Sequence, residues 1–194
     1  MKFDVIVAGV GGQGVLSLSS ILAAAALNGG LFVKQSEVHG MAQRGGAVTA
    51  HLRLSSTPVH SELVALGSAS MILSLEPLEA LRHLEYLAPG GAVVTAVDPV
   101  RNIPNYPALD ELVAAIRLLP SAVEVEAAAL ARRAGLARAT NMVMAGAAAP
   151  WLPLRPDDLE SCIRMLFASK GPVVVERNLA AFRAGREVSC SPIR

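Results

Sequence analysis

The sequence predicts an α/β fold: a single Rossmann-like domain with a mostly parallel sheet and helices on both faces. Three observations predict it. Short runs rich in Val, Ile and Leu alternate with helical patterns along the 194 residues. A glycine-rich segment separates the first apolar run from the first helical pattern. The chain is 53% hydrophobic but only 4% aromatic, so small and aliphatic side chains are expected to pack helices closely onto the sheet.

The N-terminal segment predicts a βαβ unit. Its parts are a strand at 3–8, a glycine turn at 9–14, a helix at 15–27 that ends at Asn28, and a second strand at 31–35. Strands joined in this way are parallel, and the connection between them is right-handed. A parallel pair of neighbouring strands is therefore the leading topology for this unit.

The remaining elements follow from the same alternation of patterns. Further strands are expected at 47–54, 70–75, 92–97 and 121–125. Further helices are expected at 76–87, 108–119, 127–134, 141–149, 157–171 and 173–185. Residues 98–107 contain three prolines, which deny both helical and ladder hydrogen bonds, so a long loop with a functional role is expected there. We assign residues 1–186 to the domain and 187–194 to a C-terminal tail.

Composition and charge exclude several classes of function. A net charge of +1 provides no positive field for a nucleic-acid backbone. Cys162 and Cys190 stand in no metal-ligand spacing, so no metal site or iron–sulfur cluster is expected on this chain. No export signal or membrane span is expected, and the cytoplasm is the expected compartment. Only 17% of the residues are charged, which is low for the surface of a lone domain of this size. We therefore expect part of the apolar surface to be buried against another protein.

Two interpretations of the glycine turn are open. Gly9, Gly11 and Gly14 match the spacing of a dinucleotide fingerprint, and Gly12 and Gln13 complete a candidate ligand-binding turn. The fingerprint also needs an acidic residue that closes the second strand, and the nearest one, Glu37, lies two residues beyond the predicted strand end. In the other interpretation, the glycines only let the helix pack tightly on the sheet. The amide of Gln13 suits a neighbouring chain as well as a phosphate.

The polar loop SEVHGMAQRGG at 36–46 is the second candidate site. If the neighbouring strands are parallel, this loop leaves the carboxyl edge of the sheet beside the glycine turn, where ligand sites gather. Its candidate functional side chains are Glu37, His39, Gln43 and Arg44. Gly45 and Gly46 let another molecule approach the backbone closely. A solvated loop in which Arg44 pairs with Glu37 is the competing interpretation.

Several motifs together resemble one protein family. They are GVGGQGV at 9–15, SEVHGMAQRGGAV at 36–48, LEPLEALR at 75–82, NMVMAGA at 141–147 and AAFRAG at 180–185. In order and spacing they resemble the gamma domain of the 2-oxoacid:ferredoxin oxidoreductases, and within it the beta subunit of the indolepyruvate enzymes. HGMAQRGG is far more specific than the glycine turn.

The resemblance implies a subunit that is inactive alone. In this family, thiamine diphosphate and the iron–sulfur clusters belong to a larger alpha subunit. The complex decarboxylates a 2-oxoacid such as indolepyruvate, passes electrons to ferredoxin and transfers the acyl group to coenzyme A. We therefore expect the loop from Ser36 to Gly46, together with Gly11 to Gly14, to face the alpha subunit, with Gln43 and Arg44 as polar contacts. The alternative is a stand-alone NAD(P)-binding oxidoreductase, which the glycine spacing motivates.

Overall fold

A twisted six-stranded sheet forms the centre of the computed structural model, which describes residues 1–39 and 45–190 without the side chains of His39 and Cys190. The strands are β1 (Lys2–Val10), β2 (Phe32–His39), β3 (Ala47–Ser55), β4 (Ala69–Ser74), β5 (Leu87–Ala96) and β6 (Ala122–Val125). The α-helices are α1 (Val15–Asn28), α2 (Pro77–Arg82), α3 (Leu109–Arg117), α4 (Ala127–Arg133), α5 (Thr140–Ala148), α6 (Pro156–Phe167) and α7 (Pro172–Cys190). Short 3₁₀ turns follow α2, α5 and α6.

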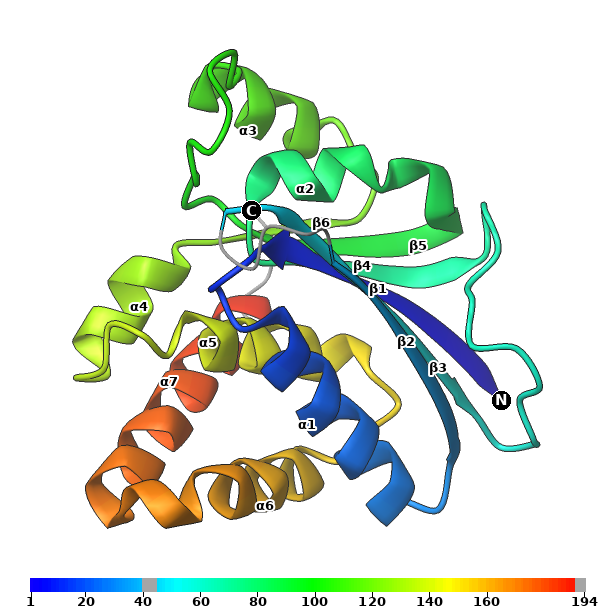
Figure 1. Cartoon of the computed structure of the whole chain (residues 1–194), viewed down its shortest axis with the longest axis vertical. Coiled ribbons are helices and arrows are strands. Elements are labelled where there is room, and N and C mark those ends of the chain that lie inside the picture. Colours follow the sequence, from blue (N-terminus) through cyan, green and yellow to red (C-terminus); the bar gives the residue numbers. More distant parts are fainter. Residues whose placement is uncertain (40–44, 191–194) are drawn as a thin grey trace.

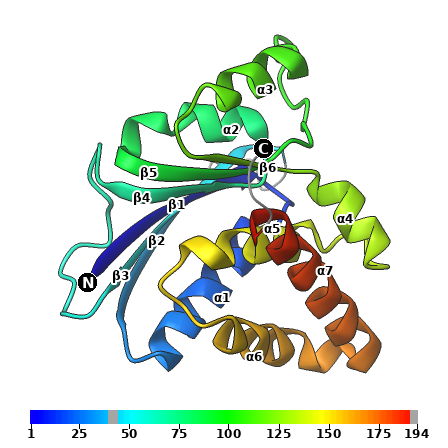
Figure 2. The ribbon, with the colours of Figure 1, turned by 180° about the vertical axis from the view of Figure 1, so that it is seen from behind.

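Helices cover both faces of the sheet, as the sequence predicts. In Figure 1, α2 and α3 lie on one side of the sheet, while α1, α5, α6 and α7 lie on the other; Figure 2 shows the same layers from behind. The alternation along β1 explains both layers, because Val5 and Val7 join the larger core beneath α1 and α5, whereas Ile6 joins a smaller cluster with Ala80 of α2. The central strands β1, β4 and β5 thus contribute apolar side chains to two separate cores.

The order of the strands is β2-β3-β1-β4-β5-β6, which corrects one predicted neighbour. β1, β4, β5 and β6 pair in parallel, but β3 lies between β2 and β1 and is antiparallel to both. β2 is therefore parallel to β1 without touching it. The physical reason is the length of the connection: residues 40–46 are too few for a parallel crossover, which needs a dozen or more, and suffice only for a hairpin.

Two strands extend at one end by a turn's length or more beyond their predicted bounds, β2 at its end and β5 at its beginning. β2 continues past Gln35 to His39, because its last residues pair with β3, Glu37 opposite Ala50 and His39 opposite Val48. The first residues of the predicted polar loop are thus part of the sheet. β5 begins at Leu87 rather than at the predicted residue 92, so PGG at 89–91 lies within a strand, where the pairing with β4 shifts register. The predicted helix at 76–87 is correspondingly short.

Helices α5 and α7 cross at a pair of glycines. A Cβ on Gly146 would lie 2.8 Å from the carbonyl carbon of Phe182, with the carbonyl oxygen closer still. A Cβ on Gly185 would lie 2.7 Å from the carbonyl carbon of Val143. The two backbones therefore touch, and α5 is buried along its length. α7 continues to Cys190, four residues beyond residue 186.

Candidate functional site

The glycine turn and the end of the polar loop are hydrogen-bonded to each other. The N–H of Gly11 donates to the carbonyl oxygen of Gly46 at 2.8 Å, and the N–H of Gly45 donates to the carbonyl oxygen of Gly11 at 3.2 Å. These bonds continue the ladder between β1 and β3 beyond Ala47. The expectation that the two turns lie side by side is confirmed, although the strand that brings them together is antiparallel.

Gln13 fastens the glycine turn to the neighbouring strand. Its Oε1 accepts from the N–H of Val10 at 2.7 Å, and its Nε2 donates to the carbonyl oxygen of Leu75 at 2.9 Å. Both ends of the amide are therefore used within the chain. The side chain holds the turn against the end of β4, so its contribution to a binding surface is to fix the shape of the turn. Its predicted contact with a ligand or partner stays a prediction.

Close packing accounts for two of the three fingerprint glycines. A Cβ on Gly9 would lie 2.9 Å from Cγ2 of Val15, and one on Gly14 would lie 2.5 Å from Nδ2 of Asn141. Gly14 also has a φ of 88°, which side chains rarely adopt. Asn141, from α5, donates to the carbonyl oxygen of Gly14 at 3.4 Å. Gly12, which lies between them in the turn, has open space around it and a φ of 104°, so its backbone conformation rather than packing favours glycine.

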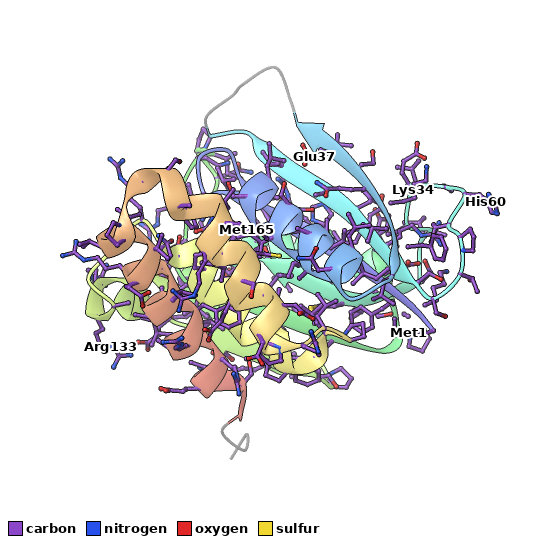
Figure 3. The ribbon with its side chains drawn as sticks, turned by 90° about the horizontal axis from the view of Figure 1, so that it is seen from below. Met1, Lys34, Glu37, His60, Arg133 and Met165 are labelled. Carbon is purple, nitrogen blue, oxygen red and sulfur yellow. The ribbon has the colours of Figure 1, made fainter. Side chains whose placement is uncertain are left out.

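Glu37, the candidate acidic residue of a dinucleotide site, does not lie next to the glycine turn. Because β3 separates β2 from β1, Glu37 stands two strand spacings, about 10 Å, from the line of β1. Its Oε1 accepts from Nε2 of Gln35 at 2.6 Å on the open edge of the sheet, where Figure 3 labels it. In that view α1 lies across β2 and β3. The geometry does not support the nicotinamide interpretation.

The other predicted side chains of the polar loop cannot be placed in this way. Gln43 and Arg44 lie outside the described residues, as does the side chain of His39. Gly45 and Gly46 are described, and Gly45 is exposed with a φ of 78°. The roles of these residues toward a partner stay predictions.

A buried glutamate, missed at the sequence level, anchors the long loop beside the glycines. Glu76 caps α2 by accepting the N–H of Glu79 at 2.9 Å, and only 1% of Glu76 is exposed. Its other oxygen accepts from the N–H of Val100 at 3.3 Å and from the hydroxyl of Tyr106. Burial, and then this bond to Glu76, raise the pKa of the Tyr106 phenol, so the hydroxyl stays protonated and donates.

Among the described residues, the loop at 98–107 is hydrogen-bonded to the end of the polar loop through Asn102. Nδ2 of Asn102 donates to the carbonyl oxygen of Gly45 at 2.7 Å. At its beginning, Asp98 accepts from the N–H of Ala128 at 2.8 Å. We define the rim as residues 9–14, 45–46 and 98–107. The prolines correctly predicted a loop. No sequence signal indicated that Asn102 of this loop contacts Gly45, or that Glu76 holds the loop.

Two of the three histidines outside the polar loop have structural partners. His51 is buried in β3, and its Nδ1 accepts from the N–H of Val64 at 3.1 Å. Burial, with a smaller contribution from the charge of His83, lowers the pKa of His51. His83 contacts the hydroxyl of Thr49 at 2.8 Å. His60 is exposed in the loop after β3. None of these residues belongs to the rim.

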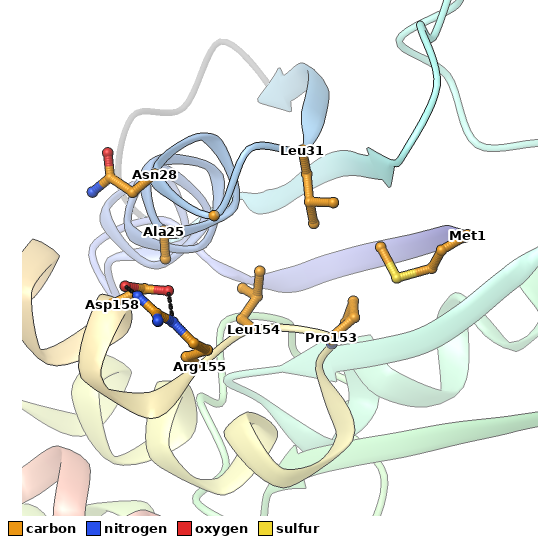
Figure 4. Close-up of a pocket in the computed structure, with 9 residues that line it drawn as sticks. Met1, Ala25, Asn28, Leu31, Pro153, Leu154, Arg155 and Asp158 are labelled. Carbon is orange, nitrogen blue, oxygen red and sulfur yellow. Dashed lines mark hydrogen bonds and ion pairs between the residues drawn. The ribbon is translucent and has the colours of Figure 1, made fainter.

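A pocket of about 450 Å³ lies at the other end of α1 (Figure 4). It is lined by Met1, by the end of α1 with the residues after it, and by the segment that enters α6. In that segment the side chains of Arg155 and Asp158 pair with each other at 2.7 Å. Since α1 rises about 1.5 Å per residue, this pocket is roughly 20 Å from the glycine turn. Cys162 lies nearby, and burial raises the pKa of its thiol, which is the opposite of activation.

Within residues 1–39 and 45–190, no three His, Cys, Asp or Glu side chains are arranged to hold a metal ion. In the same part of the chain, no helix combines the length and hydrophobicity that crossing a membrane requires.

The chain is similar to known proteins over most of its length. Residues 4–188 match the family "Pyruvate ferredoxin/flavodoxin oxidoreductase". The chain is 38% identical to the indolepyruvate oxidoreductase subunit IorB of Methanothermobacter thermautotrophicus, over 95% of this chain and 96% of that one. It is 36% identical to the IorB subunit of Archaeoglobus fulgidus, over 95% and 94% of the two chains.

A solved structure shares the fold. The 2-oxoglutarate:ferredoxin oxidoreductase from Magnetococcus marinus, determined with 2-oxoglutarate, coenzyme A and succinyl-CoA bound, superimposes with a TM-score of 0.77 at 22% identity. All of this chain is matched, but it spans only 32% of that much longer chain. At this identity the likeness concerns the fold alone.

Proposed function

Because the chain belongs to the pyruvate ferredoxin/flavodoxin oxidoreductase family, we propose that it is the small subunit of a complex that oxidatively decarboxylates a 2-oxoacid to an acyl-CoA. In this proposal thiamine diphosphate and iron–sulfur clusters reside on a larger alpha subunit, and ferredoxin accepts the electrons. Thiamine diphosphate supplies the carbanion stabilisation that decarboxylation of a 2-oxoacid requires. The present chain contributes a shaped surface to the complex, which operates in the cytoplasm.

The observation that carries the substrate assignment is the near full-length match to IorB subunits. The two indolepyruvate relatives are 36% and 38% identical over about the whole of both chains. A 2-oxoglutarate synthase subunit, KorC of Methanothermobacter marburgensis, is only 26% identical. We therefore assign indolepyruvate or another aryl pyruvate as the oxoacid. Coenzyme A is the acyl acceptor, in keeping with the coenzyme A bound to the Magnetococcus enzyme.

The rim is the surface that we assign to the alpha subunit. It combines exposed glycine backbone at Gly12 and Gly45 with two exposed aliphatic side chains on the flanking elements α1 and β2. Leu16, at the start of α1, is 40% exposed, and Val38, near the end of β2, is 57% exposed. Exposed apolar side chains next to accessible backbone suit a protein partner better than a phosphate. Gln43 and Arg44 are the polar contacts of this surface.

Reconstitution tests the function. The alpha subunit is assayed with and without this chain for ferredoxin reduction that depends on coenzyme A, with indolepyruvate, phenylpyruvate, pyruvate and 2-oxoglutarate as substrates. We expect activity only when both chains are present, and the highest kcat/KM with an aryl pyruvate. Full activity of the alpha subunit alone would refute the role of this chain. A preference for 2-oxoglutarate would refute only the substrate assignment.

Calorimetry of the isolated chain with NAD, NADP and coenzyme A tests the alternative. A dinucleotide site would give saturable binding of NAD or NADP. The separation of Glu37 from the glycine turn by β3 predicts no such binding. Saturable binding of a nicotinamide cofactor by the isolated chain would count directly against the proposed function.

A further inference from the structure

The loop at 98–107 is held on both sides of Asn102 by one buried carboxylate. Val100 precedes Asn102 and donates its N–H to Glu76, while Tyr106 follows and donates its hydroxyl to the same oxygen. The second oxygen of Glu76 is occupied by the cap of α2. Glu76 is almost fully buried, so these donors satisfy a group that would be costly to leave unpaired. The loop is thereby tied to the helix and strand framework despite its irregular backbone.

Asn102 carries this fixed position to the polar loop. Its amide donates to the carbonyl oxygen of Gly45, whose own N–H donates to Gly11. Gly45 is therefore held from two sides, by the glycine turn on its N–H and by the long loop on its carbonyl. It is exposed, and a Cβ there would meet no atom within 4 Å, so packing does not fix it. Hydrogen bonds are what place this residue.

We propose that Asn102 is a positioning residue of the rim, and that Tyr106 and Glu76 act through it. In this arrangement the long loop is a brace that fixes the last residues of the polar loop, Gly45 and Gly46, in the position in which they meet the partner. The brace itself is a property of this chain alone. Its effect on the complex rests on the proposed function, in which the rim is the docking surface of the alpha subunit.

Substitutions within the loop separate hydrogen bonding from shape. Asn102→Ala removes the amide, and Asn102→Asp keeps its size but cannot donate to a carbonyl. Tyr106→Phe removes only the hydroxyl that Glu76 accepts. The matched control is Asn105→Ala, since Asn105 is exposed on the same loop and its side chain makes no hydrogen bond within the described part of the chain.

Amide hydrogen exchange of the isolated chain, followed by NMR at Gly11 and Gly45, tests the brace without any partner. Loss of one hydrogen bond corresponds to about a fivefold increase in exchange. We expect that increase for Asn102→Ala, Asn102→Asp and Tyr106→Phe, and none for Asn105→Ala. In the Asn102→Ala background, Tyr106→Phe is expected to add nothing, because the two act in series. Unchanged exchange in Asn102→Ala, or full additivity of the two changes, would overturn the proposal.

The same variants are then titrated with the alpha subunit. We expect Asn102→Ala to weaken assembly about fivefold. The control for assembly is His60→Ala, an exposed residue outside the rim, which should stay within about twofold of wild type. Faster exchange with unchanged assembly would overturn the link between brace and docking. If the wild-type chain itself does not assemble with the alpha subunit, the proposed function fails, whereas the exchange result for the brace still stands.

Discussion

The crossing of α5 and α7 gives a sharp prediction for stability. Gly146→Ala adds a methyl group that would lie 2.8 Å from the carbonyl carbon of Phe182 and 2.9 Å from the amide nitrogen of Arg186. Both atoms belong to the backbone, so rotation of a side chain cannot relieve the overlap. The helices must move apart, and α5 is packed against the sheet on its other side. Relief therefore disturbs the larger core.

The magnitude follows from two opposing effects. Overpacking a core costs about 1–3 kcal/mol, and an overlap with backbone belongs at the upper end of that range or beyond it. Replacing glycine by alanine within a helix returns roughly 1 kcal/mol of helix propensity. We expect a net loss of about 2 kcal/mol or more in the free energy of unfolding. For a chain of this size, that lowers Tm by roughly 4–8 °C.

Urea unfolding followed by circular dichroism measures this loss. The matched control is Gly29→Ala, because Gly29 has an ordinary φ of −77° and its new Cβ would lie 3.4 Å from the nearest oxygens, Ala25 O and Ala26 O. We expect the control to stay within about 1 kcal/mol of wild type. Equal stability of the Gly146→Ala and Gly29→Ala variants would refute the claim that the backbones of α5 and α7 touch.

Three further predictions concern the rim and the sheet. Arg44→Ala should leave Tm unchanged but weaken assembly with the alpha subunit about tenfold, as loss of a charged hydrogen bond would; unchanged assembly removes Arg44 from the interface. Gln13→Ala should cost roughly 1–3 kcal/mol of stability in urea unfolding because it leaves a backbone N–H without its acceptor, whereas Gln35→Ala, on the open edge, should stay within about 0.5 kcal/mol. The pKa of His51 is lowered in the folded state. Its contribution to the free energy of unfolding is therefore complete above the ordinary pKa of 6.5 and is lost as the pH falls below that value. His51→Asn should therefore reduce the loss of stability between pH 7 and pH 5, and the exposed His60→Asn should not; identical pH profiles for both variants would contradict this account.

Most helices and strands could be predicted because the spacing of apolar residues within each one specifies its type. The apolar run of β1 and the amphipathic pattern of α6 specify their own periodicity, and the structure confirms both. The predicted neighbour of β1 was wrong because the order of strands depends on pairing between residues that are distant in the sequence. The length of the segment at 40–46 would have indicated a hairpin, but the end of β2 was placed at Gln35 rather than His39, which hid that signal.

The part of the site that is built from glycines could be predicted from the sequence. The part that depends on contacts between distant residues could not. That the turn at 9–14 meets Gly45 follows from the edge at which the strands end. The link from Asn102 to Gly45 joins residues 57 positions apart in an irregular loop, and no periodicity encodes such a contact. Glutamate is not a usual helix cap, so the sequence does not mark Glu76, and its bonds to Glu79 and Tyr106 are seen only in the folded chain.

The most direct test of the rim as a docking surface is hydrogen–deuterium exchange of this chain, measured by mass spectrometry, alone and in complex with the alpha subunit. We expect slower exchange in the complex for peptides that cover residues 9–16, 45–52 and 98–107. Protection at the opposite end of α1, in residues 25–31 and 153–158, with the rim unchanged, would contradict this expectation.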